Sequence, residues 1–122
     1  MAERVRAIRG ATTLDSDSKE QVIERTSALL QAIFDRNALQ KSDLISIVFT
    51  ATGDISSEFP AAAARQIGIS DIPLLCAREL EVDGAVTLCV RVLIHAYTER
   101  ALGELRHVYL ERAQPLRTDL PQ

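Results

Sequence analysis

The sequence predicts a single α+β domain built on a sheet of about five strands. Its 122 residues suit one domain. A long amphipathic helical pattern near the N-terminus is followed by several short apolar runs of strand length. At 47% hydrophobic and 25% charged residues, the composition is typical of a globular domain and excludes disorder and collagen-like repeats. Aromatic residues make up only 4% of the chain, so an aliphatic core is expected.

A strand and a long helix are expected in the first third of the chain. Residues 4–9 alternate as a half-buried strand does, and residues 10–17 are turn-like. Residues 18–36 carry apolar side chains at helical spacing, and Asp17 or Ser18 can cap the helix. The apolar positions of this helix are Val22, Ile23, Leu29, Leu30, Ile33 and Phe34.

A second strand and a short helix follow. Residues 44–51 are apolar almost throughout, which predicts a strand covered on both faces. After a polar loop, Pro60 suits the first turn of a helix, and Gly68 stands where a glycine commonly ends one. The alanine-rich segment between them is a strong helix former.

The remainder of the chain predicts the other strands of the sheet. The Asp-Gly pair within residues 81–85 marks a turn, and residues 99–104 form a short helical turn. The tail at 115–122 contains two prolines and is expected to be extended. The strands are expected at residues 72–77, 87–97 and 106–113.

The charge balance bears on the partners of the protein. Fourteen Lys and Arg against 17 Asp and Glu give a net charge of −3, which argues against a nucleic-acid partner. A local cluster of arginines can still hold a small anion inside an acidic protein. No apolar run approaches the roughly 20 residues of a membrane span, and no secretory signal is present. We therefore expect a cytoplasmic protein without a membrane partner, in which Cys76 and Cys89 form no disulfide framework.

Four residues stand out as candidates for an anion site. Arg91 interrupts an apolar strand, where a free cation is unfavourable, so we favour an arginine that lines a concave site over one that faces water. Arg9 precedes Gly10, which allows close approach to the backbone, although a surface charge at a strand end is the simpler interpretation. Glu79 as a solvated loop carboxylate and Tyr109 as a half-buried core residue have equally ordinary explanations.

The motifs of metal, nucleotide and nucleophilic chemistry are missing from the sequence. Cys76 and Cys89, like His95 and His107, are too far apart for a compact zinc motif. There is no GxSxG, GxxxxGK[ST] or GxGxxG. We therefore expect no metal and no cofactor, and a site that holds an anion.

Six ordered motifs, taken together, resemble one family. On these motifs the chain is similar, from about residue 4 to residue 120, to the monofunctional, trimeric chorismate mutases of the pseudo-α/β-barrel class, which differ from the all-helical class. The resemblance implies a five-stranded mixed sheet with helices packed on one side, a homotrimer, and active sites at the subunit interfaces. The motifs are IRGATT (8–13), FPAAAARQIG (59–68), PLLCARELEVDG (73–84), CVRVL (89–93), RHVYLE (106–111) and PLRTDL (115–120).

The implied reaction is the Claisen rearrangement of chorismate to prephenate, in the biosynthesis of phenylalanine and tyrosine. It is unimolecular and needs no nucleophile, metal or proton transfer. The enzyme holds a flexible dicarboxylate in its reactive conformer and stabilises the charge that builds on the ether oxygen. By resemblance, Arg91 is the cation beside that oxygen, Arg9 and Tyr109 bind a carboxylate, and Glu79 and Cys76 bond the ring hydroxyl.

The resemblance assigns further residues to the edge of the site. They are Phe59 and Leu116 as apolar walls, Arg65 and Arg117 as outer cations, and Leu75 through its backbone. Ala62 departs from the family pattern, since some relatives carry a charged residue there, which leaves the electrostatic contribution at the mouth of the site open.

Two alternatives have different functions. An imine deaminase of the Rid type has a similar trimeric architecture with a carboxylate-binding arginine, but the pair Arg9 and Arg91 with Glu79 suits a substrate with two anionic ends. A trimeric ligand-binding module with a decayed site is the non-enzymatic alternative, and the intact inner residues argue against it.

Overall fold

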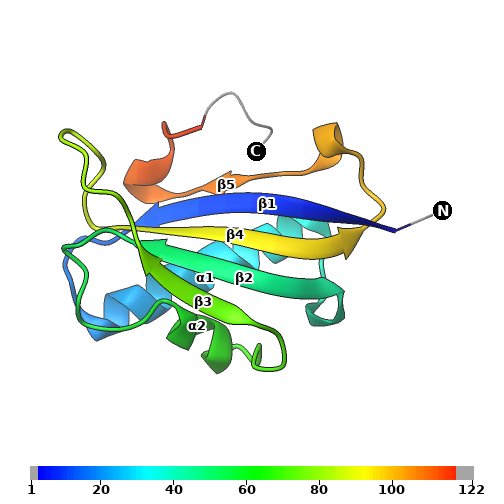
Figure 1. The fold of residues 1–122 in the computed structure, drawn as a ribbon, viewed down its shortest axis with the longest axis horizontal. Helices are drawn as coiled ribbons and strands as arrows, with labels where there is room; N and C mark the ends of the chain where they lie inside the picture. The colour runs from blue at the N-terminus through cyan, green and yellow to red at the C-terminus, as the bar shows by residue number, and fades with distance from the viewer. Residues whose placement is uncertain (1–2, 118–122) are drawn as a thin grey trace.

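A five-stranded mixed sheet with two helices on one of its faces makes up the computed structural model, which describes residues 3–117 (Figure 1). The strand order is β3-β2-β4-β1-β5. The central strand β4 runs antiparallel to β2 and β1, whereas the edge strands β3 and β5 run parallel to their neighbours. The elements are β1 (Arg4–Thr13), α1 (Lys19–Asn37), β2 (Leu44–Ala51), α2 (Ala61–Gln66), β3 (Leu74–Arg78), β4 (Cys89–Thr98) and β5 (Val108–Tyr109), with 3₁₀ turns at Lys41–Asp43, Leu102–Glu104 and Glu111–Ala113.

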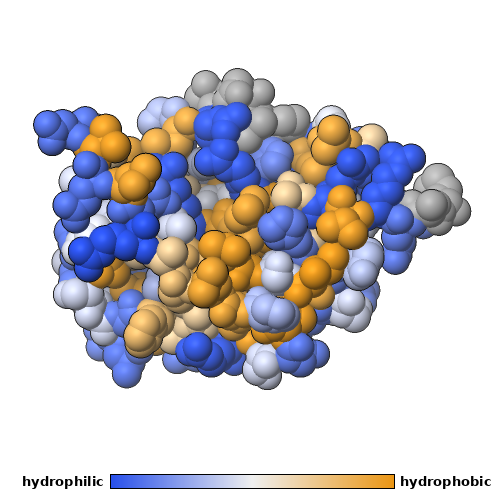
Figure 2. All heavy atoms as spheres, in the orientation of Figure 1, coloured by the Kyte–Doolittle hydropathy of each residue, from blue (hydrophilic) through white to orange (hydrophobic). Residues whose placement is uncertain are grey.

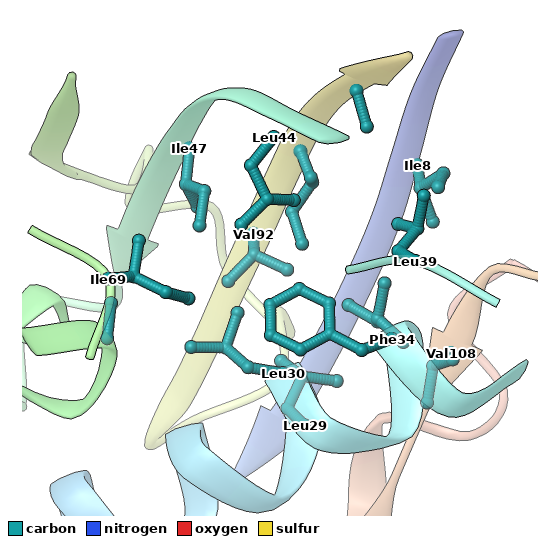
Figure 3. Packing of buried hydrophobic residues seen from close by; sticks show 14 of the residues in the cluster. Ile8, Leu29, Leu30, Phe34, Leu39, Leu44, Ile47, Ile69, Val92 and Val108 are labelled. Atoms are coloured by element: carbon teal, nitrogen blue, oxygen red, sulfur yellow. The ribbon is translucent and has the colours of Figure 1, made fainter. Parts of the chain in front are cut away.

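The predicted long helix is confirmed as α1. Ser18 caps its N-terminus, because the Ser18 side chain accepts a hydrogen bond from the Gln21 backbone. Its apolar stripe packs against the sheet and forms the main aliphatic core with the strands. Figure 3 shows side chains from both layers meeting there, among them Leu29, Leu30, Phe34, Ile8 and Val92.

Two strand predictions were wrong in extent. β1 continues through Thr13, where a turn was expected from residue 10, because it pairs with β4 along its full length. The fifth strand is only Val108–Tyr109 instead of residues 106–113, because Glu111 adopts a φ of 53° and begins a 3₁₀ turn. Residues 114–117 also form a turn, so the expected extended tail does not begin at 115; residues 118–122 lie outside the described part of the chain.

The sheet face opposite the helices is largely open within one chain. This finding differs from the expectation that β2 is covered on both faces, since its Val48 is only half-buried. Figure 2 looks onto this face and shows apolar residues gathered over the middle of the sheet, with hydrophilic residues around them. Val5, Leu75 and Tyr97 are 54%, 62% and 46% exposed. No helix within residues 3–117 is long and apolar enough to cross a membrane.

Gly10 is a point where the two layers approach closely. A Cβ on Gly10 would lie 2.8 Å from Ile33 Cδ1, 3.1 Å from Leu29 Cδ1 and 3.1 Å from the Val108 carbonyl oxygen. We predict that Gly10→Ala lowers the free energy of unfolding by about 1–3 kcal/mol, the usual effect of overpacking. Urea titration checks this, with Gly103→Ala as the control, since nothing lies within 4 Å of a Cβ there. Equal stabilities of the two variants would contradict the prediction.

Candidate active site

The pairing of the strands places polar residues in one row across the open face. Arg91 of β4 lies opposite Thr50 of β2 and Ala11 of β1, and Ala11 in turn pairs with Tyr109 of β5. Since paired residues point to the same face of a sheet, the small Ala11 leaves space between Arg91 and Tyr109. Arg91 therefore lies on the central strand of the sheet.

A cavity of about 390 Å³ lies over this row. It brings together Arg9, Glu79, Arg91 and Tyr109, which we call the central group. Val48 and Leu93 add apolar walls, and Gly10, Thr50 and Val92 complete the lining. The sequence-predicted residues that touch this cavity thus include two cations and one carboxylate, an excess of positive charge that suits an anionic ligand.

Glu79 is the carboxylate partner of Arg91. Its backbone N–H donates to the Ala51 carbonyl oxygen at 2.9 Å, which fixes the start of the loop after β3 against β2. The Glu79 Oε2 atom lies 3.6 Å from Arg91 Nε and accepts a hydrogen bond from Thr50 Oγ1. Arg91 Nε is buried and has no hydrogen-bond partner within residues 3–117, so its donor capacity is unused beside the ion pair. Sequence reasoning missed Thr50, although it is a polar interruption of an apolar strand.

A small apolar cluster on the open face covers one end of the cavity. It contains Ala11, Cys89, Tyr109 and Ala113, and Leu116 packs against it. The 3₁₀ turn that holds Ala113 is fixed to β1, because the Arg112 backbone N–H donates to Thr13 Oγ1 at 3.1 Å. The predicted wall residue Leu116 therefore packs against the cluster that contains Tyr109. Its neighbour Arg117 is half-buried and acts electrostatically on His107.

Cys89 is a buried thiol next to the central group. Burial raises the pKa of the Cys89 thiol, while the positive charge of Arg91 acts in the opposite direction. The net upward shift keeps the thiol protonated at neutral pH. Arg91 is therefore balanced by the Glu79 carboxylate and not by a thiolate.

The other predicted residues lie along the β3 edge and form what we call the edge group: Phe59, Arg65, Leu75 and Cys76. Phe59 and Cys76 line a second cavity of about 360 Å³, together with the loop before α2. Cys76 pairs with Phe49 and packs against the main core, so it points to the helix side of the sheet. Arg65, in the last turn of α2, is exposed, as is Leu75. One chain therefore does not bring the edge group into the cavity of the central group.

The loop that carries Phe59 is held by Asp17, the residue before the cap of α1. The Asp17 carboxylate accepts hydrogen bonds from the Ser56 backbone at 3.0 Å, the Ser56 hydroxyl at 3.1 Å and the Ser57 backbone at 3.1 Å. Hydrogen bonding from the Ser57 side chain, and then from the Ser56 backbone, lowers the pKa of Asp17 below the ordinary 3.8. Asp17, expected only as a cap, instead positions one wall of the second cavity.

Comparison with known proteins connects these residues to a family. Residues 5–120 match the family described as chorismate mutase type I. The chain is 44% identical over 117 residues to chorismate mutase AroH of Thermus thermophilus, covering 95% of this chain and 96% of that protein. It is 37% identical over 117 residues to chorismate mutase AroH of Bacillus subtilis (strain 168), covering 95% and 92%. A solved chorismate mutase from Clostridium thermocellum, Cth-682, superposes with a TM-score of 0.89 at 38% identity, over 90% of this chain and 98% of that one.

The Asp17 contacts predict a pH dependence of the loop. Because the folded-state pKa is lowered, the contacts stabilise the loop above the ordinary value of 3.8 and are lost as pH falls through the lowered value. We expect the amide resonances of Ser56 and Ser57 to titrate with a midpoint below 3.8 in NMR spectra. Asp17→Asn should abolish this titration, whereas the control Asp35→Asn, on the exposed side of α1, should leave it intact. A midpoint at or above the ordinary value would contradict the prediction.

Proposed function

The chain belongs to the type I chorismate mutase family, and we propose that it converts chorismate to prephenate in the cavity of the central group. It is an isomerase, and the family assignment selects this activity over imine deamination. The observation that carries the choice of site is Arg91, a cation on the middle strand of the sheet that lines the cavity and whose buried Nε has no hydrogen-bond partner in the described residues.

The rearrangement sets two requirements for the site. The ether C–O bond of the substrate breaks while a C–C bond forms in the same molecule, so electrons are redistributed without loss or gain of a proton. Negative charge grows on the ether oxygen as the bond breaks. Arg91 Nε is the donor for this oxygen, and its permanent charge costs little reorganisation because the side chain is held by strand and ion pair.

The second requirement is to hold the substrate in its folded, reactive conformer. Arg9 and Tyr109 lie in the same cavity as Arg91 and bind a substrate carboxylate at one end. Fixing both reacting ends in contact replaces a conformational search with a bound geometry. Leu116, which packs against the cluster that contains Tyr109, supplies an apolar wall, and its neighbour Arg117 is an outer cation.

Glu79 contributes at the opposite side of the reacting atoms. Its carboxylate accepts a hydrogen bond from the ring hydroxyl of the substrate. It also faces the allylic fragment, where positive charge develops. Thr50 and Arg91 restrict the carboxylate to one orientation through the Oε2 atom. This arrangement lets one ion pair stabilise both ends of the charge separation in the transition state.

The edge group completes the site from another copy of the chain. Phe59 and Leu75 are 66% and 62% exposed, and the apolar middle of the sheet is open, so both surfaces are available to a second copy. We propose a homotrimer in which Phe59, Cys76, Arg65 and the Leu75 backbone of one subunit face the central group of the next. In this assembly Phe59 is a wall against the substrate ring, Cys76 bonds its hydroxyl, and Arg65 lies at the mouth.

Substitution of Arg91 tests the proposed site. We expect the parent protein to convert chorismate to prephenate, followed by the loss of the diene absorbance and identification of the product. Arg91→Ala should raise the barrier by at least about 3–4 kcal/mol, the cost of losing one oxyanion donor, with the folded structure retained. Arg91→Lys should also be severely impaired, because it keeps the charge but loses the planar guanidinium.

The controls separate the site from the fold. Circular dichroism and the free energy of unfolding should be close to those of the parent for both variants, since the Arg91 side chain lies outside the main core. Turnover by Arg91→Ala at the parent rate would refute the assigned role. A folded parent protein without any turnover would refute the proposed function itself.

Mixed assemblies test whether two copies build each site. Arg91→Ala inactivates the central group, and Phe59→Asp places a carboxylate against the anionic substrate in the edge group. Coexpressed at equal amounts, the two variants should recover about one quarter of the parent activity, because a site is intact when its central group comes from Phe59→Asp and its edge group from Arg91→Ala. Two tagged copies and tandem purification isolate the mixed trimers, in which one site of three is intact, so about one third of the parent activity is expected there. Recovery of no activity in folded mixed trimers would show that each site lies within one chain.

A further inference from the structure

His107 forms a hydrogen bond with the backbone of Arg9 that the proposed mechanism does not use. Of the two histidines in the sequence, His107 is only 8% exposed, whereas His95 is half-buried. The Arg9 backbone N–H donates to His107 Nδ1 at 3.0 Å. This contact joins β1 to the segment that enters β5, at the residue whose guanidinium lines the central cavity.

The hydrogen bond lies at the end of a short ladder. The parallel pairs of β1 and β5 are Gly10 with Val108 and Ala11 with Tyr109. One residue earlier, the side chain of His107 supplies the acceptor for the Arg9 N–H in place of a backbone carbonyl. The orientation of β1 at Arg9 therefore depends on an imidazole nitrogen.

This bond requires the neutral form of His107. When Nδ1 accepts, the single proton of the neutral ring is on Nε2, and the imidazolium form cannot accept at Nδ1 at all. Burial, then the positive charges of Arg9 on β1 and Arg117 in the C-terminal turn, lower the pKa of His107. The adjacent Arg106 donates its Nη1 to the Gly103 and Leu105 carbonyl oxygens, and the α1 residue that bonds the Arg106 backbone, Asn37, is uncharged. The groups around His107 therefore favour its neutral form.

We propose that His107 is a positioning residue that fixes the backbone of Arg9 and thereby aims the Arg9 guanidinium at the substrate carboxylate; this inference rests on the proposed function. Arg9 binds a carboxylate that is charged in both the ground state and the transition state. Loss of the hydrogen bond should therefore raise KM more than it lowers kcat.

Protonation of His107 is expected to change KM in the direction opposite to that expected from charge alone. An additional positive charge near Arg9 and Arg117 would strengthen binding of a dianion if charge alone mattered. Loss of the hydrogen bond to Arg9 weakens binding instead. The inference therefore requires KM to rise as pH falls below about 6.5, the ordinary value for histidine.

Two variants distinguish the effect of losing the hydrogen-bond acceptor at His107 from the effect of protonating this residue. His107→Asn places Oδ1 near the position of Nδ1 and does not titrate, so its KM should stay near the parent value at neutral pH and lose the rise at low pH. His107→Leu removes the acceptor, and its KM should be raised about 2–10-fold at every pH, the equivalent of one net hydrogen bond, with kcat changed less. An unchanged KM in His107→Leu, or the same acidic rise in His107→Asn as in the parent, would overturn the inference.

NMR of the imidazole nitrogens tests the bond without turnover. The parent should show His107 as the Nε2–H tautomer with a pKa below that of a free histidine, and His95→Gln assigns the two rings. The Arg9 amide resonance should shift with the same midpoint and should not titrate in His107→Asn. An Nδ1–H tautomer would overturn the inference. An inactive parent would overturn the proposed function instead, and the NMR result would still decide the hydrogen bond.

Discussion

A guanidinium on the middle strand of the sheet is the constraint on which the rest of the site depends. Burying part of a cation between strands is unfavourable unless a carboxylate lies close to it. Glu79 meets this need only because the loop after β3 is bonded to Ala51 and its carboxylate is held by Thr50. The residues around the ion pair are small or aliphatic, which leaves a concave space next to the charge. The same arrangement that makes Arg91 tolerable in the fold also places Arg91 in the lining of the cavity, with the donor capacity of its Nε unused in the described residues.

The two faces of the sheet divide structural and chemical tasks. The helix face buries the aliphatic core. The tight packing at Gly10 shows how closely this core fixes the positions of the strands. The open face carries the central group, and its remaining surface is apolar. An apolar sheet face exposed in a monomer favours association, so assembly of copies would cover this surface and supply the edge group in the same step. In the proposed trimer, stability and activity would then depend on the same contacts.

The sequence predicts the elements that depend on local pattern and misses those that depend on a distant partner. The long helix follows from periodicity and β2 from a continuous apolar run, and both match closely in extent. The far half of β1 looks like a turn from its Gly-Ala-Thr-Thr composition, but pairing with β4 makes it a strand. β5 is instead shorter than its sequence predicts, because a positive φ at Glu111 ends the extended segment.

The candidate site shows the same difference. Arg91 can be predicted because a charge in an apolar strand is conspicuous at the level of sequence. Thr50 and His107 could not be assigned, because a threonine in a strand and a buried histidine have ordinary explanations until their partners are known. The separation of Cys76 from Glu79 is equally invisible in the sequence: only three residues apart, they line different cavities because Cys76 points to the helix side of β3 while Glu79 reaches across the open face.

Two titratable side chains beside the central group, Cys89 and His107, are both held in their neutral forms. They therefore neither neutralise nor add to the positive charge of the cavity. A Cys89 thiolate would neutralise Arg91, but burial outweighs the attraction of the cation and keeps the thiol protonated. A protonated His107 would add charge but lose the hydrogen bond to Arg9, and burial and the neighbouring arginines favour its neutral form. The permanently charged guanidiniums of Arg9 and Arg91 therefore determine the electrostatic field of the cavity, and the Glu79 carboxylate reduces it. A substrate that carries its own charges and exchanges no proton during the reaction needs a field of this kind, fixed in strength and in direction.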